Sequence, residues 1–263
     1  MLSKIQNERI TVCIPTMNRK KLLTRFVKSY VTNCPIKTDF VFVNSNENKV
    51  SVDEEISLLI SESENTYVDH YIPPSSVGEA RKVAFDIAMD LGNEFVFTGD
   101  DDCRVSKLAI EKMLAPIMQD DRFWKVGHLG GYRVFMRDFK ENEVRFHLNI
   151  GVLWVITLSV LKKIGNIDSS LFVREDTEFD ARIWHNGGWT AIVDAKVAHS
   201  RFQKLEAGKR TIPDNMSETW IDANDLIANR FPDIFKHKSG RLYKQFKFPE
   251  NKFSLKENLR LYS

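Results

Sequence analysis

Short apolar runs alternate with amphipathic stretches along the first half of the chain, and this alternation limits the fold more than any other property of the sequence. Residues 10–14 (ITVCI), 39–43 (DFVFV) and 94–98 (EFVFT) are rich in β-branched and aromatic side chains, which is typical of buried strands. Residues 20–31 and 78–91 carry apolar side chains at helical spacing. The alternation predicts an α/β fold with a largely parallel sheet and helices on both faces.

The second half of the chain carries a weaker pattern of the same kind. We expect mixed strands over 124–134, a short helix over 157–164, a helix over 176–185 and a strand over 189–197. The longest apolar run, residues 150–161, has 12 residues, whereas a helix that spans a membrane needs about 20. The N-terminus also lacks the apolar core of a secretion signal, so we expect no integral membrane segment.

The composition is that of an ordinary globular protein. The 263 residues are 43% hydrophobic and 28% charged, with a net charge of +2, which excludes a fibrous or wholly disordered chain and gives no polyelectrolyte character. The three cysteines, Cys13, Cys34 and Cys103, are too few and too scattered for a disulfide scaffold or a zinc module. We therefore expect a reduced, cytoplasmic compartment.

Three consecutive aspartates, Asp100, Asp101 and Asp102, directly follow the third predicted strand and its glycine. In parallel α/β sheets, ligands bind beyond the carboxyl ends of the strands. Asp100 and Asp102 are alternate residues of an extended segment, so they point the same way and could share Mg²⁺ or Mn²⁺. The alternative is a solvated acidic turn before the helix expected from Ser106.

Three further groups have both a functional and a structural interpretation. Glu175 and Asp176 could supply a general base, or they could stabilise the positive end of a helix dipole. His199 closes an apolar strand and becomes a metal ligand only if the fold brings it to the aspartates. Arg81 lies near a helix start, where it could contact a phosphate or form a surface salt bridge.

Several reaction classes lack their characteristic motifs. The first predicted strand leads into PTMNRKK, which has no glycine, so a dinucleotide loop, a Walker loop and a sugar-1-phosphate nucleotidyltransferase are disfavoured. The chain has no G-x-S-x-G and no H-E-x-x-H. Cys103 follows three acids, and their charge raises the pKa of a thiol and makes it a poor nucleophile.

Taken in order, these segments resemble the family 2 glycosyltransferases of the GT-A fold. TVCIPTMNR resembles the family's first strand and nucleotide loop, GEARKVAFDIA its G-x-A-x-N helix, and FVFTGDDDC its D-x-D strand. Residues 161–199 resemble its acceptor-side segment, with a Glu-Asp pair, an amphipathic helix and a closing histidine. The resemblance covers about residues 9–201 and implies a Rossmann-like, mostly parallel central sheet flanked by helices.

The resemblance also implies a division of the chain. Residues 1–203 would form the glycosyltransferase core, with a nucleotide half over about 9–120 and an acceptor half over about 121–203. Residues 204–263 would form a basic, aromatic-rich helical extension.

The resemblance further implies metal-dependent, inverting transfer of a sugar from a nucleotide-sugar, most simply a UDP-sugar. Asp100 and Asp102 would hold Mn²⁺ or Mg²⁺, with His199 as the third ligand. Asp176 would deprotonate the acceptor hydroxyl, and Glu175 would help to position the acceptor. The residues implied in donor binding are Pro15, Thr16, Arg19, Asn44, Arg81, Asp100 and Asp101.

Two positions depart from the family's pattern. Asn44-Ser45-Asn46-Glu47 stands where typical members carry aspartates that read uracil, and an amide both donates and accepts hydrogen bonds. Lys82 stands where the family has asparagine, which adds a positive charge near the donor. Selectivity for UDP is therefore open.

The acceptor is not defined by the resemblance. Residues 236–260 hold eight Lys or Arg and two acids, interleaved with aromatic residues, a pattern that suits a phosphate backbone with stacked bases. The alternative is one or two amphipathic helices packed on the core. The residues expected at the acceptor are Trp154, Lys244 and Lys247.

Three acceptor classes stay open: a hydroxymethylated pyrimidine in DNA, a bacterial surface glycan or lipid-linked sugar, and a protein side chain. The short, Lys-, Asn- and Phe-rich chain resembles phage-encoded enzymes, which favours DNA and the host cytoplasm. The competing interpretations are a retaining transferase and an inactive module that binds a sugar nucleotide or nucleic acid. The intact aspartates and the Glu-Asp pair argue against the inactive module.

Overall fold

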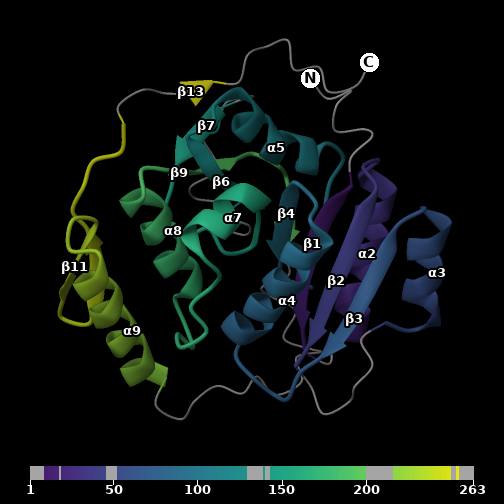
Figure 1. The fold of residues 1–263 in the computed structure, drawn as a ribbon, viewed down its shortest axis with the longest axis horizontal. Coiled ribbons are helices and arrows are strands. Elements are labelled where there is room, and N and C mark those ends of the chain that lie inside the picture. Colours follow the sequence, from purple (N-terminus) through teal and green to yellow (C-terminus); the bar gives the residue numbers. More distant parts are fainter. Residues whose placement is uncertain are drawn as a thin grey trace.

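A nine-stranded sheet forms the centre of the protein (Figure 1). The structure is a computed structural model, and it describes residues 9–17, 19–45, 52–128, 139, 143–199, 216–249 and 253–254. The strand order is β13-β7-β9-β6-β8-β4-β1-β2-β3. The strands are β1 (Ile10–Thr16), β2 (Thr38–Asn44), β3 (Thr66–Tyr71), β4 (Phe95–Gly99), β6 (Phe123–His128), β7 (Glu143–Phe146), β8 (Leu153–Thr157), β9 (Trp189–Val193) and β13 (Phe253–Ser254).

The first four strands run parallel to one another. β1 pairs with β2 and with β4, and β2 pairs with β3, all in parallel register. This confirms the expected parallel sheet, and it brings the carboxyl ends of these strands to one edge. The other half is mixed, because β8 runs antiparallel between β4 and β6 while β6 and β9 run parallel.

Helices cover both faces of the sheet (Figure 1). The helices on one face are α2 (Lys20–Asn33), α3 (Glu54–Glu62) and α5 (Ala109–Gln119). Those on the other are α4 (Val77–Leu91), α7 (Leu158–Ile164) and α8 (Glu175–His185). The helical stripes predicted from the sequence are thus confirmed, and none of the described helices is long and apolar enough to cross a membrane.

One helix start differs from the prediction. α5 begins at Ala109, and Leu108 before it adopts the left-handed conformation with φ 66°. The Ser106 hydroxyl does not cap the helix but donates to the Ala195 carbonyl at 3.0 Å. A contact between segments distant in sequence therefore takes the place of the local cap.

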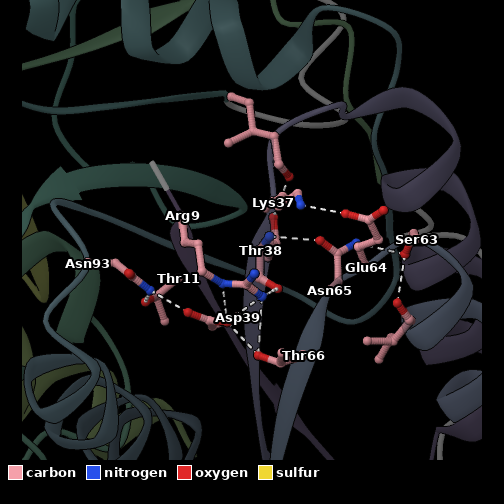
Figure 2. A network of polar contacts seen from close by, with 12 residues as sticks. Arg9, Thr11, Lys37, Thr38, Asp39, Ser63, Glu64, Asn65, Thr66 and Asn93 are labelled. Atoms are coloured by element: carbon pink, nitrogen blue, oxygen red, sulfur yellow. Dashed lines mark hydrogen bonds and ion pairs between the residues drawn. The ribbon is translucent and has the colours of Figure 1, made fainter. Parts of the chain in front are cut away.

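Polar side chains join the amino ends of β1, β2 and β3 (Figure 2). Asp39 of β2 accepts from Arg9 Nε at 2.7 Å and from Asn93 Nδ2 at 2.8 Å, and it also bonds Thr66 of β3. This cluster lies at the end of the sheet opposite the aspartates, since it surrounds the residues with which the parallel strands begin.

Within the described residues of the C-terminal extension, a helix is followed by a hairpin and by the short strand β13. α9 (Met216–Arg230) is followed by β11 (Phe235–Lys238) and β12 (Arg241–Lys244), which pair antiparallel. The basic stretch was expected to be helical, but its described part is this hairpin and the segment after it; Lys252, Lys256 and Arg260 lie outside the described residues. The turn of this hairpin is Ser239-Gly240. Both residues have a positive φ, which the favoured type of two-residue hairpin turn requires.

The extension shares a core with the rest of the protein. Ile227 of α9 is fully buried, and it lies in one apolar cluster with Leu148 and with Ala181 of α8. Phe246 and Phe248, which follow the hairpin, pack against Trp184 in tilted geometry, at 5.0 and 5.3 Å between ring centroids.

Candidate active site

The three aspartates lie where the parallel strand β4 ends. Gly99 before them is required by close packing, since a Cβ there would lie 2.6 Å from Leu153 Cδ1 of β8. After the aspartates, β5 (Cys103–Arg104) pairs antiparallel with β10 (Ala198–His199). His199 is the register partner of Cys103, so a short two-stranded ladder fixes the histidine beside the carboxylates.

The fold therefore brings His199 to the aspartates, which the sequence left open. His199 Nε2 lies 3.0 Å from Asp102 Oδ1 and 3.4 Å from Asp100 Oδ2. Burial lowers the pKa of His199, but hydrogen bonds and negative charge from Asp100 and Asp102 outweigh it and raise the pKa to about 9. One ligand atom from each of the three residues lies within 4.8 Å of the others.

Two carboxylates and an imidazole at this spacing fit a divalent cation. Hard oxygen ligands with one nitrogen suit Mn²⁺ or Mg²⁺. Arg81 holds one oxygen of Asp100 at 2.9 Å, and the other oxygen faces the histidine. The neighbouring Cys103 is fully buried, and its pKa is raised by burial and by Asp100 and Asp102, which confirms that it is a poor thiolate.

Asp101 faces away from the cation site and ties down the end of β1. It is fully buried, and its Oδ2 accepts from Thr16 Oγ1 at 2.8 Å and from Arg19 Nε at 3.1 Å. Burial raises the pKa of Asp101 to about 7, against the opposing effect of Arg19 and Thr16. Asn44 is the register partner of Thr16 on β2. Four residues expected at the donor therefore lie at one edge of the sheet: Thr16, Arg19, Asn44 and Asp101.

Arg81 links the aspartates to the acids of α8. Its Nη2 donates to Asp100 Oδ1 at 2.9 Å and to the Gly151 carbonyl at 3.1 Å, while its Nη1 donates to Glu175 Oε1 at 2.7 Å. The side chain is 4% exposed. The surface salt bridge considered for Arg81 is therefore wrong: this is a buried bridge between two parts of the site, 94 positions apart at Glu175.

The two acids of α8 differ in access. Glu175 is buried, and its pKa is raised to about 7 by burial and by the charge of Asp176, with Arg81 opposing. Asp176 is partly exposed, and its Oδ1 accepts from the backbone of Thr177 at 2.7 Å. One oxygen thus bonds the backbone in the first turn of the helix, as the structural interpretation expects, while the side chain keeps an exposed surface, and the role of general base stays a prediction.

Of the three residues expected at the acceptor, Trp154 is excluded by its burial, and Lys244 and Lys247 stay predictions. The Trp154 side chain is fully buried in the core, packed between Phe85 and Phe179, so it has no surface to offer an acceptor, and this expectation is wrong. Lys244 lies over the Phe248 ring at 3.6 Å, and that ring packs against Trp184. Trp184 is at the far end of α8 from Asp176, about 12 Å along the helix axis at a 1.5 Å rise per residue. Lys247 is exposed on the same segment.

Sequence reasoning missed a buried ion pair behind the site. Lys125 of β6 donates to Asp180 of α8 at 2.6 Å, and both side chains are 0% exposed. Lys125 lies one position after Trp124 in a strand, and Asp180 lies on a helix among buried residues. A charged residue among buried apolar ones can be seen in the sequence at Lys125 and at Asp180, but the sequence does not show that the two are partners.

Comparison with known proteins supports the fold assignment. No family model matches the chain, and neither does any curated protein. Among solved structures, GalNAc-T7 crystallised with UDP, GalNAc and Mn²⁺ aligns with a TM-score of 0.68 and 18% identity, over 86% of this chain and 49% of that one. Residues 1–349 of S. aureus TarS in complex with UDP-GlcNAc align with a TM-score of 0.58 and 17% identity, over 84% of this chain and 67% of that one.

These structures are GT-A glycosyltransferases, and the chain has their fold. It spans about half the length of GalNAc-T7 and 40% of the longer TarS structure. At 16–18% identity the likeness concerns the arrangement of the backbone, so activity has to be argued from the side chains described above.

Proposed function

We propose that this chain is a metal-dependent glycosyltransferase that moves a sugar from a UDP-sugar to an acceptor hydroxyl, with inversion at the anomeric carbon. One observation carries the proposal. A cation-binding set, Asp100, Asp102 and His199, lies next to a partly exposed carboxylate, Asp176, and the two are joined through Arg81 and Glu175. GalNAc-T7, which shares the fold, was crystallised with UDP, GalNAc and Mn²⁺, and residues 1–349 of TarS were crystallised with UDP-GlcNAc.

The chain's own residues divide the reaction between them. Asp100, Asp102 and His199 would hold the cation, which when bound neutralises the charge of the diphosphate leaving group. Asp176 accepts the proton of the acceptor hydroxyl while the oxygen of that hydroxyl bonds the anomeric carbon. The bond between the anomeric carbon and the diphosphate breaks, and the diphosphate leaves with the electron pair. Attack from the face opposite the leaving group inverts the anomeric carbon. Glu175, being buried on Arg81, holds the site together.

Replacing Asp176 by Asn tests the assignment of the base. The variant removes the proton acceptor and leaves the cation and donor residues unchanged, so it should bind the donor as the wild type does and lose transfer. Donor binding is followed by thermal shift with Mn²⁺ and a panel of UDP-sugars, where a donor at 100 times its Kd stabilises by about 2.7 kcal/mol. Transfer is followed by release of UDP. Weakened donor binding in Asp176→Asn would contradict the role of base.

Removal of the cation tests the other half of the site. EDTA, or the double substitution Asp100→Ala/Asp102→Ala, should abolish both the donor-dependent thermal shift and UDP release, because both treatments remove the cation that neutralises the diphosphate. In EDTA the free carboxylates repel the diphosphate as well. Undiminished UDP release in EDTA would refute metal dependence. A donor-dependent shift without release of UDP would favour an inactive module that binds a sugar nucleotide, and no shift with any sugar nucleotide would contradict donor binding. The anomeric configuration of the product, from its proton coupling constant, separates inversion from retention.

For the acceptor we propose a hydroxymethylated pyrimidine in DNA, with a surface glycan or lipid-linked sugar as the alternative. The support is the basic and aromatic composition of residues 236–260. The hydroxyl would have to be reached in the major groove or by flipping the base. Labelled donor should be incorporated into hydroxymethylcytosine DNA and not into unmodified DNA of the same sequence. Equal absence of label from both excludes this acceptor.

A further inference from the structure

The segment of residues 149–151, which leads into β8, contacts Asp180, Arg81 and Asp176. Asn149 adopts the left-handed conformation with φ 70°, which asparagine tolerates better than most residues. The next amide, Ile150 N, donates to Asp180 Oδ2 at 2.9 Å. The next carbonyl, that of Gly151, accepts from Arg81 Nη2 at 3.1 Å. Residues 149–151 are thus held from two sides.

The same segment also packs directly against the Asp176 carboxylate. A Cβ at position 151 would lie 2.4 Å from Asp176 Oδ2, so the carboxylate rests directly on the glycine. With its amide nitrogen facing that carboxylate, Asn149 donates to both Asp176 oxygens, at 3.3 and 3.2 Å. A movement of this segment would therefore displace the carboxylate.

Asp180 owes its charge to Lys125. Asp180 Oδ1 accepts from Lys125 Nζ at 2.6 Å, and the ammonium also lies 4.0 Å above the centre of the Trp154 ring. Burial raises the pKa of Asp180 to about 6, and burial lowers that of Lys125, while each charge opposes the shift of the other. A buried ion pair contributes little net stability compared with apolar residues of the same shape, so what the pair holds in place matters more than its own energy.

We propose that Asp180 is a positioning residue for the base: through the Ile150 amide it fixes residues 149–151, and these fix the Asp176 carboxylate. The inference rests on the proposed function, since it assigns Asp176 the proton of the acceptor. Asp180 bonds Lys125 and the Ile150 amide, and neither member of the pair bonds Asp100, Asp102 or His199. The pair therefore acts on the proton transfer only through residues 149–151 and Asp176.

Two double variants separate the hydrogen bond from the charge. Lys125→Met/Asp180→Asn removes both charges and keeps an oxygen for the Ile150 amide. Lys125→Met/Asp180→Leu removes both charges and the acceptor, at nearly the same volume. Because both members of the pair are replaced together, neither variant leaves a buried charge unpaired. Thermal unfolding without ligand reports whether each variant is folded.

The readout is release of UDP from a UDP-sugar with Mn²⁺ and water as the acceptor, together with donor binding by thermal shift. The Leu variant should lose about 10- to 100-fold in kcat, the range expected for a reacting group displaced by about 1 Å, with donor binding unchanged. The Asn variant should restore kcat to within about threefold of the wild type. Gly151→Ala presses on the same carboxylate without touching the ion pair and should lower kcat in the same way, which keeps the test valid if the Leu variant does not fold.

The outcomes distinguish this inference from the function on which it rests. If Asp176→Asn releases UDP as fast as the wild type, the proposed function fails and the inference fails with it. If Asp176→Asn is inactive while folded Leu and Gly151→Ala variants keep wild-type kcat, only the inference is overturned. Loss of donor binding along with kcat in these variants also overturns it, because the pair would then support the donor site.

Discussion

At the scale of single residues, Arg81 decides whether the acids of the site can stand so close together. Asp100 and Glu175 are separate parts of the site, and one guanidinium with two nitrogens serves both. The planar fork of arginine makes this possible, since a lysine ammonium would have to choose between them. Without the guanidinium, burial would favour the protonated form of Glu175 still more strongly than it does now.

Replacing Arg81 by Met should lower the free energy of unfolding by about 3–5 kcal/mol, because the buried Glu175 and the partly buried Asp100 both lose the guanidinium that they contact. The matched control is Lys82→Met on the next position of α4, where Lys82 forms an exposed pair with Asp86 and is 39% exposed. The control should change stability by no more than about 0.5 kcal/mol. Urea unfolding of both variants at pH 7 measures the difference, and equal effects would show that Arg81 is not a structural bridge.

At the scale of elements, the amino ends of the parallel strands are joined by the cluster around Asp39 (Figure 2). Parallel neighbours are not joined by a tight turn, so side chains supply the link there. Burial raises the pKa of Asp39, but hydrogen bonds from Arg9, Thr66 and Asn93 outweigh it and hold the pKa below its ordinary value.

This depressed pKa predicts an acid-dependent contribution to stability. The contribution is complete above the pKa of the unfolded carboxyl, about 3.9, and is lost as the pH falls through the lower folded value. Asp39→Asn should therefore be less stable than the wild type by about 1 kcal/mol at pH 7, since the amide keeps one acceptor and solvent screens the lost charge. The gap in Tm should close toward pH 3. A gap that stays constant from pH 7 to pH 3 would mean that no ionised Asp39 stabilises the fold.

At the scale of the whole molecule, the described part of the C-terminal extension packs against the core. Ile227 of α9 packs with Ala181 of α8 and with Leu148, which directly precedes the segment of residues 149–151. Arg230, the last residue of α9, pairs with Asp168 and with Glu178 of α8. The extension thus supports the helix that carries Glu175 and Asp176.

Truncation of Ile227 to Ala should lower the free energy of unfolding by about 2–5 kcal/mol, the usual range for emptying a buried site of this size. The control is Ile221→Ala on the same helix, which is 41% exposed and should cost less than about 0.5 kcal/mol. Calorimetry should show one transition for both variants. A separate low-temperature transition that alone responds to Ile227→Ala would mean that the extension folds independently.

The sequence by itself determined several helices and strands and which chemical groups lie at their ends. Strands β1, β2 and β4 and helices α2, α4 and α8 were predicted within a few residues, because the period of apolar side chains is a local property. The aspartates after β4 and the acids at the start of α8 were visible for the same reason: each group is contiguous in the chain.

Only the tertiary structure decided which of these groups meet. His199 became a neighbour of Asp102 through the ladder of β10 and β5, Arg81 became a bridge over 94 positions, and Trp154 went to the core instead of the acceptor. The ion pair of Lys125 and Asp180 was likewise invisible. The physical reason is that side-chain spacing along a strand or helix sets which face a residue occupies, whereas its partners across that face depend on how the whole sheet and its helices pack.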